Sequence, residues 1–283
     1  DNPYDVGMTG LIGFASGYKA MMSCDTLLML GTNFPYRQFY PEHGYIAQID
    51  LRSEALGNRC PLELGLIGDV KLTLQAVLPK VQQNPDRQHL DTALKDYKKA
   101  REDLDALAES GPDSSIIHPQ YLNRLVNELA DEDAIFTCDV GTPTAWAARY
   151  LKMNGKRRLV GSFNLGSMAN AVLQAIGAQA AFPDRQVISM SGDGGFTMMM
   201  GDFLTLNQVG LPIKVIVLNN RPLGFVEMEM KAAGFPDVGC DLKNPNFAAM
   251  AEAMGVKGIR VEHPHELEAA LREPASLLID HAN

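Results

Sequence analysis

The sequence predicts an α/β protein of two domains, each a mostly parallel sheet covered by helices on both faces. The first observation is that short apolar runs rich in β-branched residues alternate with amphipathic stretches, as in repeated βα units. The second is the length of 283 residues, which exceeds what one hydrophobic core usually serves. The third is a cluster of turn residues, Gly111-Pro112-Asp113-Ser114-Ser115, that interrupts the pattern. We therefore predict one domain over residues 1–112 and another over residues 113–283.

Three short strands are predicted in the first domain, over residues 26–31, 45–50 and 64–68. The first is a continuous apolar run that ends in Gly31, and the second ends in Asp50, about twenty residues later. An acid at a strand end near a Gly-rich turn suits a ribose hydroxyl, and a cap on the following turn explains Asp50 equally well. Helices are predicted over residues 70–78, with Asp69 as the N-cap, and over residues 87–108.

The second domain alternates helices and strands to its end. Predicted helices cover residues 121–130, 143–153, 167–181, 202–209, 246–254 and 265–272. Predicted strands cover residues 134–138, 187–190, 213–218, 258–261 and 276–280. This alternation predicts a parallel sheet with helices on both faces.

The composition is that of an ordinary globular protein, with 46% hydrophobic and 21% charged residues. A net charge of −9 argues against a nucleic-acid-binding surface, because neutralising phosphates needs clustered Lys and Arg. The one basic run, Lys156-Arg157-Arg158, is interpreted as a solvated loop. Reduced thiols in a cytoplasmic protein explain the cysteines at positions 24, 60, 138 and 240, which show no metal-ligand spacing. No apolar run approaches the roughly 18 residues of a membrane span.

Two polar turns follow strands of the second domain. Gly192-Asp193-Gly194-Gly195 comes after the strand over residues 187–190, and Asn219-Asn220 follows the strand over residues 213–218. The helix between them makes the unit a strand, a helix and a parallel strand, so both turns lie at the carboxyl edge of the sheet, where α/β sheets bind ligands. Carboxylate, amide and carbonyl oxygens suit Mg²⁺ held with substrate phosphates, and glycines let the backbone approach a phosphate. Each turn alone is commonplace, whereas the pair predicts a metal and phosphate site.

This pair of turns resembles the diphosphate- and metal-binding motif of thiamine-diphosphate enzymes. The runs over residues 136–144 and 146–158 further resemble bacterial pyruvate oxidases that use a flavin and reduce a quinone, and the resemblance covers nearly the whole chain. It implies thiamine diphosphate, Mg²⁺ and FAD as cofactors, and oxidation of pyruvate to acetate and CO₂ with electrons passed to FAD and then to a quinone. The alternatives are a non-oxidative carboligase resembling acetolactate synthase and a cofactor-binding module without catalysis.

The resemblance assigns cofactor contacts in the second domain by motif position. The implied metal ligands are Asp193, Asn220 and the carbonyl of Pro222. The implied contacts to the cofactor are Gly141, Thr142, Gly166, Met168, Gly192, Gly194 and Gly195, of which Met168 matches the large apolar residue beneath the thiazolium ring.

Two further positions match the substrate pocket of the family. Phe225 and Glu229, one helical turn apart, are the implied catalytic residues, and a solvated helix acid explains Glu229 equally well. Leu165 stands where relatives carry a histidine, and this departure bears on the identity of the 2-oxo acid.

In the first domain the resemblance implies a flavin site. The residues are Gly7, Thr9, Gly31, Thr32, Asn33, Arg37, Asp50 and Asp69. The guanidinium of Arg37 would face the flavin or its diphosphate, where it can make paired charge-assisted hydrogen bonds. A solvent-exposed Arg is the alternative interpretation.

The resemblance also implies polypeptide beyond this chain. In the family, the glutamate that activates the cofactor comes from an N-terminal domain of a neighbouring subunit, and nothing in these residues matches it. We therefore expect an N-terminally incomplete flavin domain and a fragment or processed chain that binds cofactors without turning over pyruvate. Relatives form homo-oligomers, namely tetramers, and reach the inner face of the cell membrane through a C-terminal tail that we expect this chain to lack.

Overall fold

The computed structural model divides the chain into two compact units, residues 1–104 and 105–283. It describes residues 2–109, 115–274 and 277–282. The predicted domain boundary between residues 112 and 113 lies outside the described residues.

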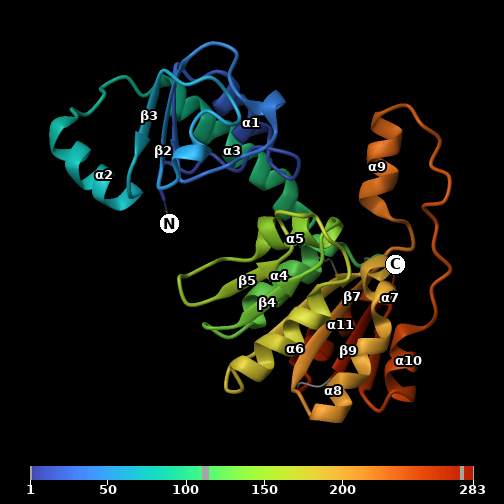
Figure 1. Ribbon diagram of the computed structural model, residues 1–283. Helices are drawn as coiled ribbons and strands as arrows, with labels where there is room; N and C mark the ends of the chain where they lie inside the picture. The colour runs from blue at the N-terminus through green and yellow to red at the C-terminus, as the bar shows by residue number, and fades with distance from the viewer. Residues whose placement is uncertain (1, 110–114, 275–276, 283) are drawn as a thin grey trace. The chain divides into compact units, whose positions relative to one another are not determined.

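The first unit is built on a three-stranded parallel sheet in the order β1-β2-β3 (Figure 1). Its strands are β1 (Thr26–Leu30), β2 (Tyr45–Asp50) and β3 (Leu64–Ile67). Its helices are α1 (Ala15–Met22), α2 (Val70–Val77) and α3 (Gln88–Ala106), with short 3-10 turns η1 (Arg37–Phe39), η2 (Ser53–Ala55) and η3 (Leu78–Lys80). Asp69 is the N-cap of α2, as predicted, and accepts a hydrogen bond from the backbone N–H of Leu72 at 2.9 Å.

The second unit contains a six-stranded sheet in the order β5-β4-β6-β7-β9-β8, in which every pairing is parallel. The strands are β4 (Ile135–Cys138), β5 (Arg158–Gly161), β6 (Val187–Gly192), β7 (Ile213–Asn219), β8 (Lys257–Val261) and β9 (Leu277–Ala282). The helices are α4 (Pro119–Leu129), α5 (Thr142–Tyr150), α6 (Ala171–Ala181), α7 (Asp193–Met198), α8 (Leu204–Val209), α9 (Gly224–Ala232), α10 (Phe247–Ala253) and α11 (Pro264–Arg272), with the 3-10 turn η4 (Met200–Phe203).

Helices cover both faces of this sheet (Figure 1). Alternate strand residues point to opposite faces, so each face has its own apolar core. One core packs side chains of α4, α5 and α11 against strand residues that include Phe136, Met190 and Ile216. The other packs side chains of α6, α8 and α10 against strand residues that include Val187 and Val215. The predicted α/β class, with two parallel sheets flanked by helices, is confirmed.

The order of the strands determines where a ligand can bind. After β4 the chain first adds β5 on one side and then crosses to add β6 on the other. The loops that leave β4 and β6 therefore diverge and leave a crevice outside the carboxyl ends of these strands, where open α/β sheets bind ligands.

The interpretation of the basic run at residues 156–158 as a solvated loop holds for Lys156, which is exposed and lies in the loop before β5, but not for the two arginines. Arg158 begins β5. The guanidinium of Arg157 donates to the backbone carbonyls of Asn127 and Ala130 at 3.1 and 2.7 Å, at the carboxyl end of α4. A guanidinium satisfies the free carbonyls at the end of a helix and interacts favourably with its dipole, so Arg157 connects α4 to the loop that leads into β5.

Two expectations from the sequence concern membrane-spanning segments and the state of the cysteines, and both can be compared with the described residues. Within them, no helix combines the length and apolar character that crossing a membrane would require. All four cysteines are free thiols. Burial raises the pKa of the Cys138 thiol to about 12, so this cysteine is inert as a nucleophile.

Protonation of His281 is expected to destabilise the fold. This residue lies on β9 and is buried, with Nε2 3.2 Å from the carbonyl oxygen of Ile117. Its Nδ1 has no hydrogen-bond partner within the described part of the chain. Burial lowers the pKa of His281 to about 4, from 6.5 for an ordinary histidine.

The unfolded chain binds this proton at a higher pH than the folded protein. The contribution of His281 to the free energy of unfolding is therefore complete above about pH 6.5 and falls by about 3 kcal/mol as the pH is lowered to about 4. Urea denaturation of the wild type and of His281→Leu across this range checks the prediction, because the variant should lack this part of the pH dependence. Parallel curves for the two proteins would contradict it.

Candidate active site

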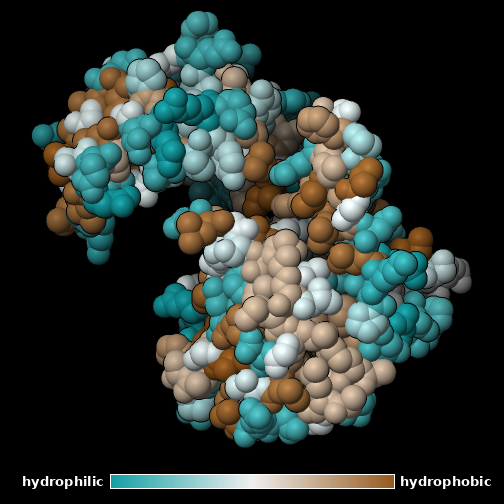
Figure 2. All heavy atoms as spheres, turned by 45° about the vertical axis from the view of Figure 1, so that its right-hand side comes forward, coloured by the Kyte–Doolittle hydropathy of each residue, from teal (hydrophilic) through white to brown (hydrophobic). Residues whose placement is uncertain are grey.

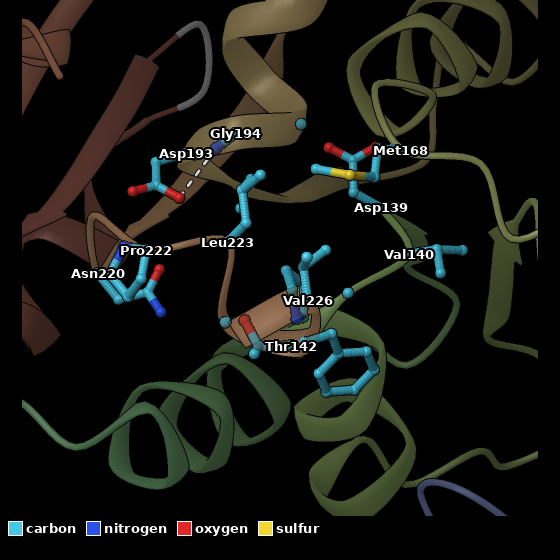
Figure 3. A pocket seen from close by; sticks show the side chains of 16 residues that line it. Asp139, Val140, Thr142, Met168, Asp193, Gly194, Asn220, Pro222, Leu223 and Val226 are labelled. Carbon is cyan, nitrogen blue, oxygen red and sulfur yellow. Dashed lines mark hydrogen bonds between the residues drawn. The ribbon is translucent and has the colours of Figure 1, made fainter. Parts of the chain in front are cut away.

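A pocket opens at the carboxyl ends of β4, β6 and β7, at the crevice between the β4 and β6 loops. It is lined by Asp139, Val140, Gly141, Thr142, Pro143, Met168, Gly192, Asp193, Gly194, Gly195, Asn220, Pro222, Leu223, Gly224, Phe225 and Val226. Figure 3 shows Asp193, Asn220 and Pro222 on one side of this pocket, and Asp139 with Met168 on the other. The two turns singled out in the sequence thus meet in one pocket, as the parallel pairing of β6 and β7 predicts.

Asp193 is a buried carboxylate held by three N–H donors. Its Oδ1 accepts from the backbone N–H of Gly194 at 2.9 Å, and its Oδ2 accepts from the backbone N–H of Arg221 at 2.7 Å and from Nδ2 of Asn244 at 2.6 Å. Burial raises the pKa of Asp193, and these hydrogen bonds lower it in part. None of the donors carries a charge, so within the described part of the chain the carboxylate has no cationic partner.

The residues at this end of the pocket fit a magnesium ion. The described residues hold no group of three His, Cys, Asp or Glu side chains that could bind a metal. A cation here would instead use the carboxylate of Asp193, the amide oxygen of Asn220, the carbonyl of Pro222 and phosphate oxygens from a ligand. Oxygen ligands of this kind, completed by phosphate, suit Mg²⁺, which would supply the positive charge that buried Asp193 lacks.

The two neighbouring amides at the end of β7 have different surroundings. Asn219 is buried, and its Nδ2 donates to Oδ1 of Asp280 at 3.0 Å, which directs it into the interior. Asn220 is exposed to the pocket that it lines. Arg221 then adopts a positive φ of 70°, and this turn brings Pro222 to the pocket wall. Asn220 is therefore the amide that is free for a ligand.

The start of α5 provides the opposite wall. Gly141 has φ 135° and ψ −154°, a conformation that is essentially restricted to glycine, and it stands immediately before Thr142 at the first turn of α5. The free N–H groups of a helix N-terminus suit an anion such as a diphosphate. Gly141 and Thr142 both line the pocket, as do Gly192, Gly194 and Gly195 across from them.

Asp139 is a site residue that the sequence analysis did not select. It is 1% exposed and its Oδ1 accepts from the backbone N–H groups of Asn170 and Ala171, at 2.7 and 2.9 Å. Burial raises the pKa of Asp139, while these two donors lower it. The carboxylate thereby caps α6 across the pocket and holds the turn that carries Met168. An acid directly after a strand at the carboxyl edge was the available signal, as it was for Asp193.

The other predicted positions are only partly brought together. Phe225 lines the pocket from the first turn of α9, whereas Glu229 on the same helix is exposed and is not among the lining residues. Gly166 and Leu165 also stand outside the pocket lining, and Leu165 is 87% exposed. Apolar side chains of α9 reach the surface as well, among them Met228, and Figure 2 shows brown, apolar atoms in this region.

The residues assigned to a flavin lie in the first unit, and several of them are engaged within the chain. Oδ1 of Asp50 accepts from the backbone N–H of Arg52 at 2.9 Å, so Asp50 caps its own turn. Oδ1 of Asn33 accepts from Nε of Arg59 at 2.8 Å, and Asp69 caps α2.

The remaining flavin candidates occupy turns of the same unit. Gly7 and Gly31 have positive φ angles of 88° and 59°, and the carbonyl of Thr32 accepts from the side chain of Gln48 at 3.4 Å. Arg37 is exposed at the start of η1. Oγ1 of Thr9 is buried, with no hydrogen-bond partner among the described residues.

Comparison with known proteins points to the same regions. The family profile described as "Thiamine pyrophosphate enzyme, C-terminal TPP binding domain" matches residues 139–279. The profile described as "Thiamine pyrophosphate enzyme, central domain" matches residues 1–77. All of the pocket residues fall within the first of these two ranges.

Curated relatives match almost the whole of this chain. YdaP of Bacillus subtilis, provisionally named a thiamine pyrophosphate-containing protein, is 36% identical over 272 residues, which are 96% of this chain and 47% of YdaP. The acetolactate synthase large subunit of Lactococcus lactis is 30% identical over 279 residues, 94% of this chain and 47% of that protein. The large subunit of Porphyra purpurea is 31% identical over 295 residues, 99% of this chain and 49% of that protein. The chain thus spans about half the length of these relatives.

Proposed function

Because the chain belongs to the thiamine pyrophosphate enzymes and carries their central and C-terminal domains, we propose that it forms the diphosphate- and metal-binding part of a carboligase. The enzyme would decarboxylate pyruvate and join the two-carbon unit to a second 2-oxo acid, the type of reaction for which its acetolactate synthase relatives are named. This favours the carboligase alternative of the sequence analysis over pyruvate oxidation.

The observation that carries the proposal is the pairing of Asp193 and Asn220 at the ends of adjacent parallel strands. Asp193 is a buried charge whose three donors are all neutral, and Asn220 stands beside it with its amide at the pocket. A Mg²⁺ diphosphate complements both groups, because the cation meets the carboxylate while the phosphates meet the N–H groups at the start of α5.

Thiamine diphosphate, when bound, supplies the carbon nucleophile that attacks a 2-oxo group and the electron sink for decarboxylation. The chain's own residues would orient and enclose it. Met168 on one wall and Leu223, Phe225 and Val226 on another present apolar surface to the pocket. Such a lining excludes water from a reactive carbon, which favours transfer to a second 2-oxo acid over loss to solvent.

The activating glutamate expected from the family has no match in this sequence. We therefore propose that it comes from other polypeptide, and that the protein acts as a homo-oligomer in which another subunit completes the site. The 283-residue chain by itself is expected to bind the cofactor and Mg²⁺ without measurable turnover of pyruvate.

Oxidative decarboxylation is the second candidate, favoured by the runs over residues 136–144 and 146–158 that resemble pyruvate oxidases. This reaction requires FAD as electron acceptor and a quinone that takes the electrons from FAD, with contact at the membrane surface. In the first unit, Asp50, Asn33 and Asp69 already accept hydrogen bonds within the chain, and among the described residues assigned to the flavin only Thr9 has a buried polar atom without a partner. No step of the proposed reaction therefore passes through a flavin.

One assay separates the two candidates. The protein, alone and together with the N-terminal domain of a relative, is incubated with pyruvate, thiamine diphosphate and Mg²⁺, and acetolactate and acetate are both quantified. Acetolactate in the reconstituted sample supports carboligation. Acetate formed with reduction of an added quinone analogue, together with a flavin absorption spectrum in the purified chain, would support oxidation in its place. Turnover by the isolated chain would contradict the proposed need for other polypeptide.

A further inference from the structure

Asn244 connects the two polar turns of the pocket without lining the pocket itself. It precedes α10, and its side-chain amide nitrogen donates to Oδ2 of Asp193 at 2.6 Å and to Oδ1 of Asn219 at 2.9 Å. It is half-buried and lies 51 residues from the first partner and 25 from the second. One amide group therefore ties together the ends of β6 and β7.

The orientation of this amide follows from its neighbours. Nδ2 of Asn219 donates to Oδ1 of Asp280 at 3.0 Å, and this carboxylate is fully buried. A carboxylate can only accept, so the nitrogen of Asn219 faces Asp280 and its oxygen faces Asn244. Asn244 must then present its NH₂ group to both oxygens.

Asp280 is itself anchored away from the pocket. Its Oδ2 accepts from the backbone N–H of Phe247 at 3.2 Å and from the Arg260 guanidinium at 3.4 Å. The relay from Arg260 through Asp280 and Asn219 gives Asn244 a rigid support.

From this geometry we infer that Asn244 is a positioning residue that holds the carboxylate of Asp193 in the orientation required by a divalent cation. The inference rests on the proposed function, because it concerns the metal of that same site. The other two donors to Asp193 are backbone N–H groups, so among the described residues Asn244 provides the one side-chain hydrogen bond to Asp193 that a substitution can remove. A neutral amide suits this task, since it fixes the carboxylate and leaves its negative charge for the cation.

The test is the Mg²⁺ dependence of thiamine diphosphate binding to the full chain, measured by titration calorimetry for the wild type and Asn244→Ala. We expect the apparent Kd for Mg²⁺ to rise by about 10- to 100-fold, as is usual when a group that orients a metal ligand is removed. Asn246→Ala is the matched control. Asn246 lies two residues away, accepts from the backbone N–H of Ala249 at 2.9 Å as the N-cap of α10, and is not among the described residues that donate to Asp193.

A purely structural role would lower the urea midpoint of both variants and leave the Kd for Mg²⁺ within about twofold of the wild type in both. That outcome would overturn the inference. Asn244→Leu, of similar volume and without a donor, replaces the alanine variant if the latter does not fold, and the same rise in Kd is expected.

Asp193→Ala distinguishes failure of the inference from failure of the proposed function. If Asp193→Ala weakens Mg²⁺ binding and Asn244→Ala does not, only the inference is overturned. If Asp193→Ala binds Mg²⁺ as the wild type does, or if the wild type shows no saturable Mg²⁺-dependent binding, the cation site and the inference fail together.

Discussion

Asp193→Ala is expected to weaken Mg²⁺-dependent binding of thiamine diphosphate by at least about 100-fold while changing the free energy of unfolding by less than about 2 kcal/mol. Binding falls because the variant loses the one carboxylate that lines the metal end of the pocket. Stability changes little because two effects oppose each other. The substitution removes the acceptor of the Arg221 N–H and of one of the two N–H groups of the Asn244 amide, which costs about 1–3 kcal/mol each, but it also removes a buried, uncompensated charge worth several kcal/mol.

The binding and stability of Asp193→Ala are measured by calorimetry and urea denaturation at one pH. Asp184→Ala is the control, because it removes an equal charge from an exposed position outside the pocket. Loss of binding in proportion to a loss of stability would contradict a specific metal role for Asp193.

The raised pKa of Asp193 adds a pH dependence of known sign. The folded, metal-free protein binds this proton at a higher pH than the unfolded chain, whose aspartates titrate near 3.8. The contribution of Asp193 to stability therefore grows as the pH falls through its raised pKa, opposite in sign to that of His281. Mg²⁺ competes with the same proton, so the affinity for Mg²⁺ should fall over that range.

Much of the fold could be predicted because the apolar patterns along the sequence agree with the burial of these residues in the folded protein. β2 and β7 are largely buried strands rich in apolar residues, and their observed bounds differ from those predicted by at most one residue. β5 escaped prediction since it is a short edge strand whose residues alternate between exposed and half-buried and whose first residue, Arg158, ends the basic run. The helix predicted from residue 167 begins at Ala171, because Gly166 and Ala169 adopt positive φ and hold the preceding residues in a turn. A positive φ at an alanine leaves no signature in the sequence.

The site was predictable to the extent that strand topology determines it. Asp193 and Asn220 follow parallel strands, and parallel neighbours bring their carboxyl ends together. Asn244 follows no strand and belongs to no periodic pattern, so only the fold places it against Asp193. Glu229 shows where spacing alone is insufficient. Spacing along a helix places Phe225 and Glu229 on one face, but it does not indicate what that face covers.

Gly195→Ala is expected to lower the free energy of unfolding by about 3–5 kcal/mol, through a clash with a residue on the far side of the pocket. A Cβ at this buried position would lie 2.5 Å from Oδ2 and 3.0 Å from Cγ of Asp139. Overpacking of a core costs about 1–3 kcal/mol, and relief by movement of Asp139 would stretch its two hydrogen bonds to the start of α6.

Gly177→Ala is the matched control for this substitution. Gly177 lies within α6, is exposed, and has no heavy atom within 4 Å of the added Cβ. Alanine at such a helix position should raise the free energy of unfolding by about 0.5–1 kcal/mol, so urea denaturation should move in opposite directions for the two variants. A loss below about 1 kcal/mol for Gly195→Ala would contradict the prediction.

A double-mutant cycle identifies the partner responsible. If the carboxylate of Asp139 causes the clash, Gly195→Ala should cost at least about 1–2 kcal/mol less in an Asp139→Ala background than in the wild type. Additive costs would place the strain elsewhere, with the backbone N of Ala169 as the next neighbour at 3.4 Å. Asp139 also holds the turn that carries Met168. A coupling between the two substitutions would therefore mean that Gly195 is required for the shape of the opposite pocket wall, in addition to any role in the approach of a phosphate.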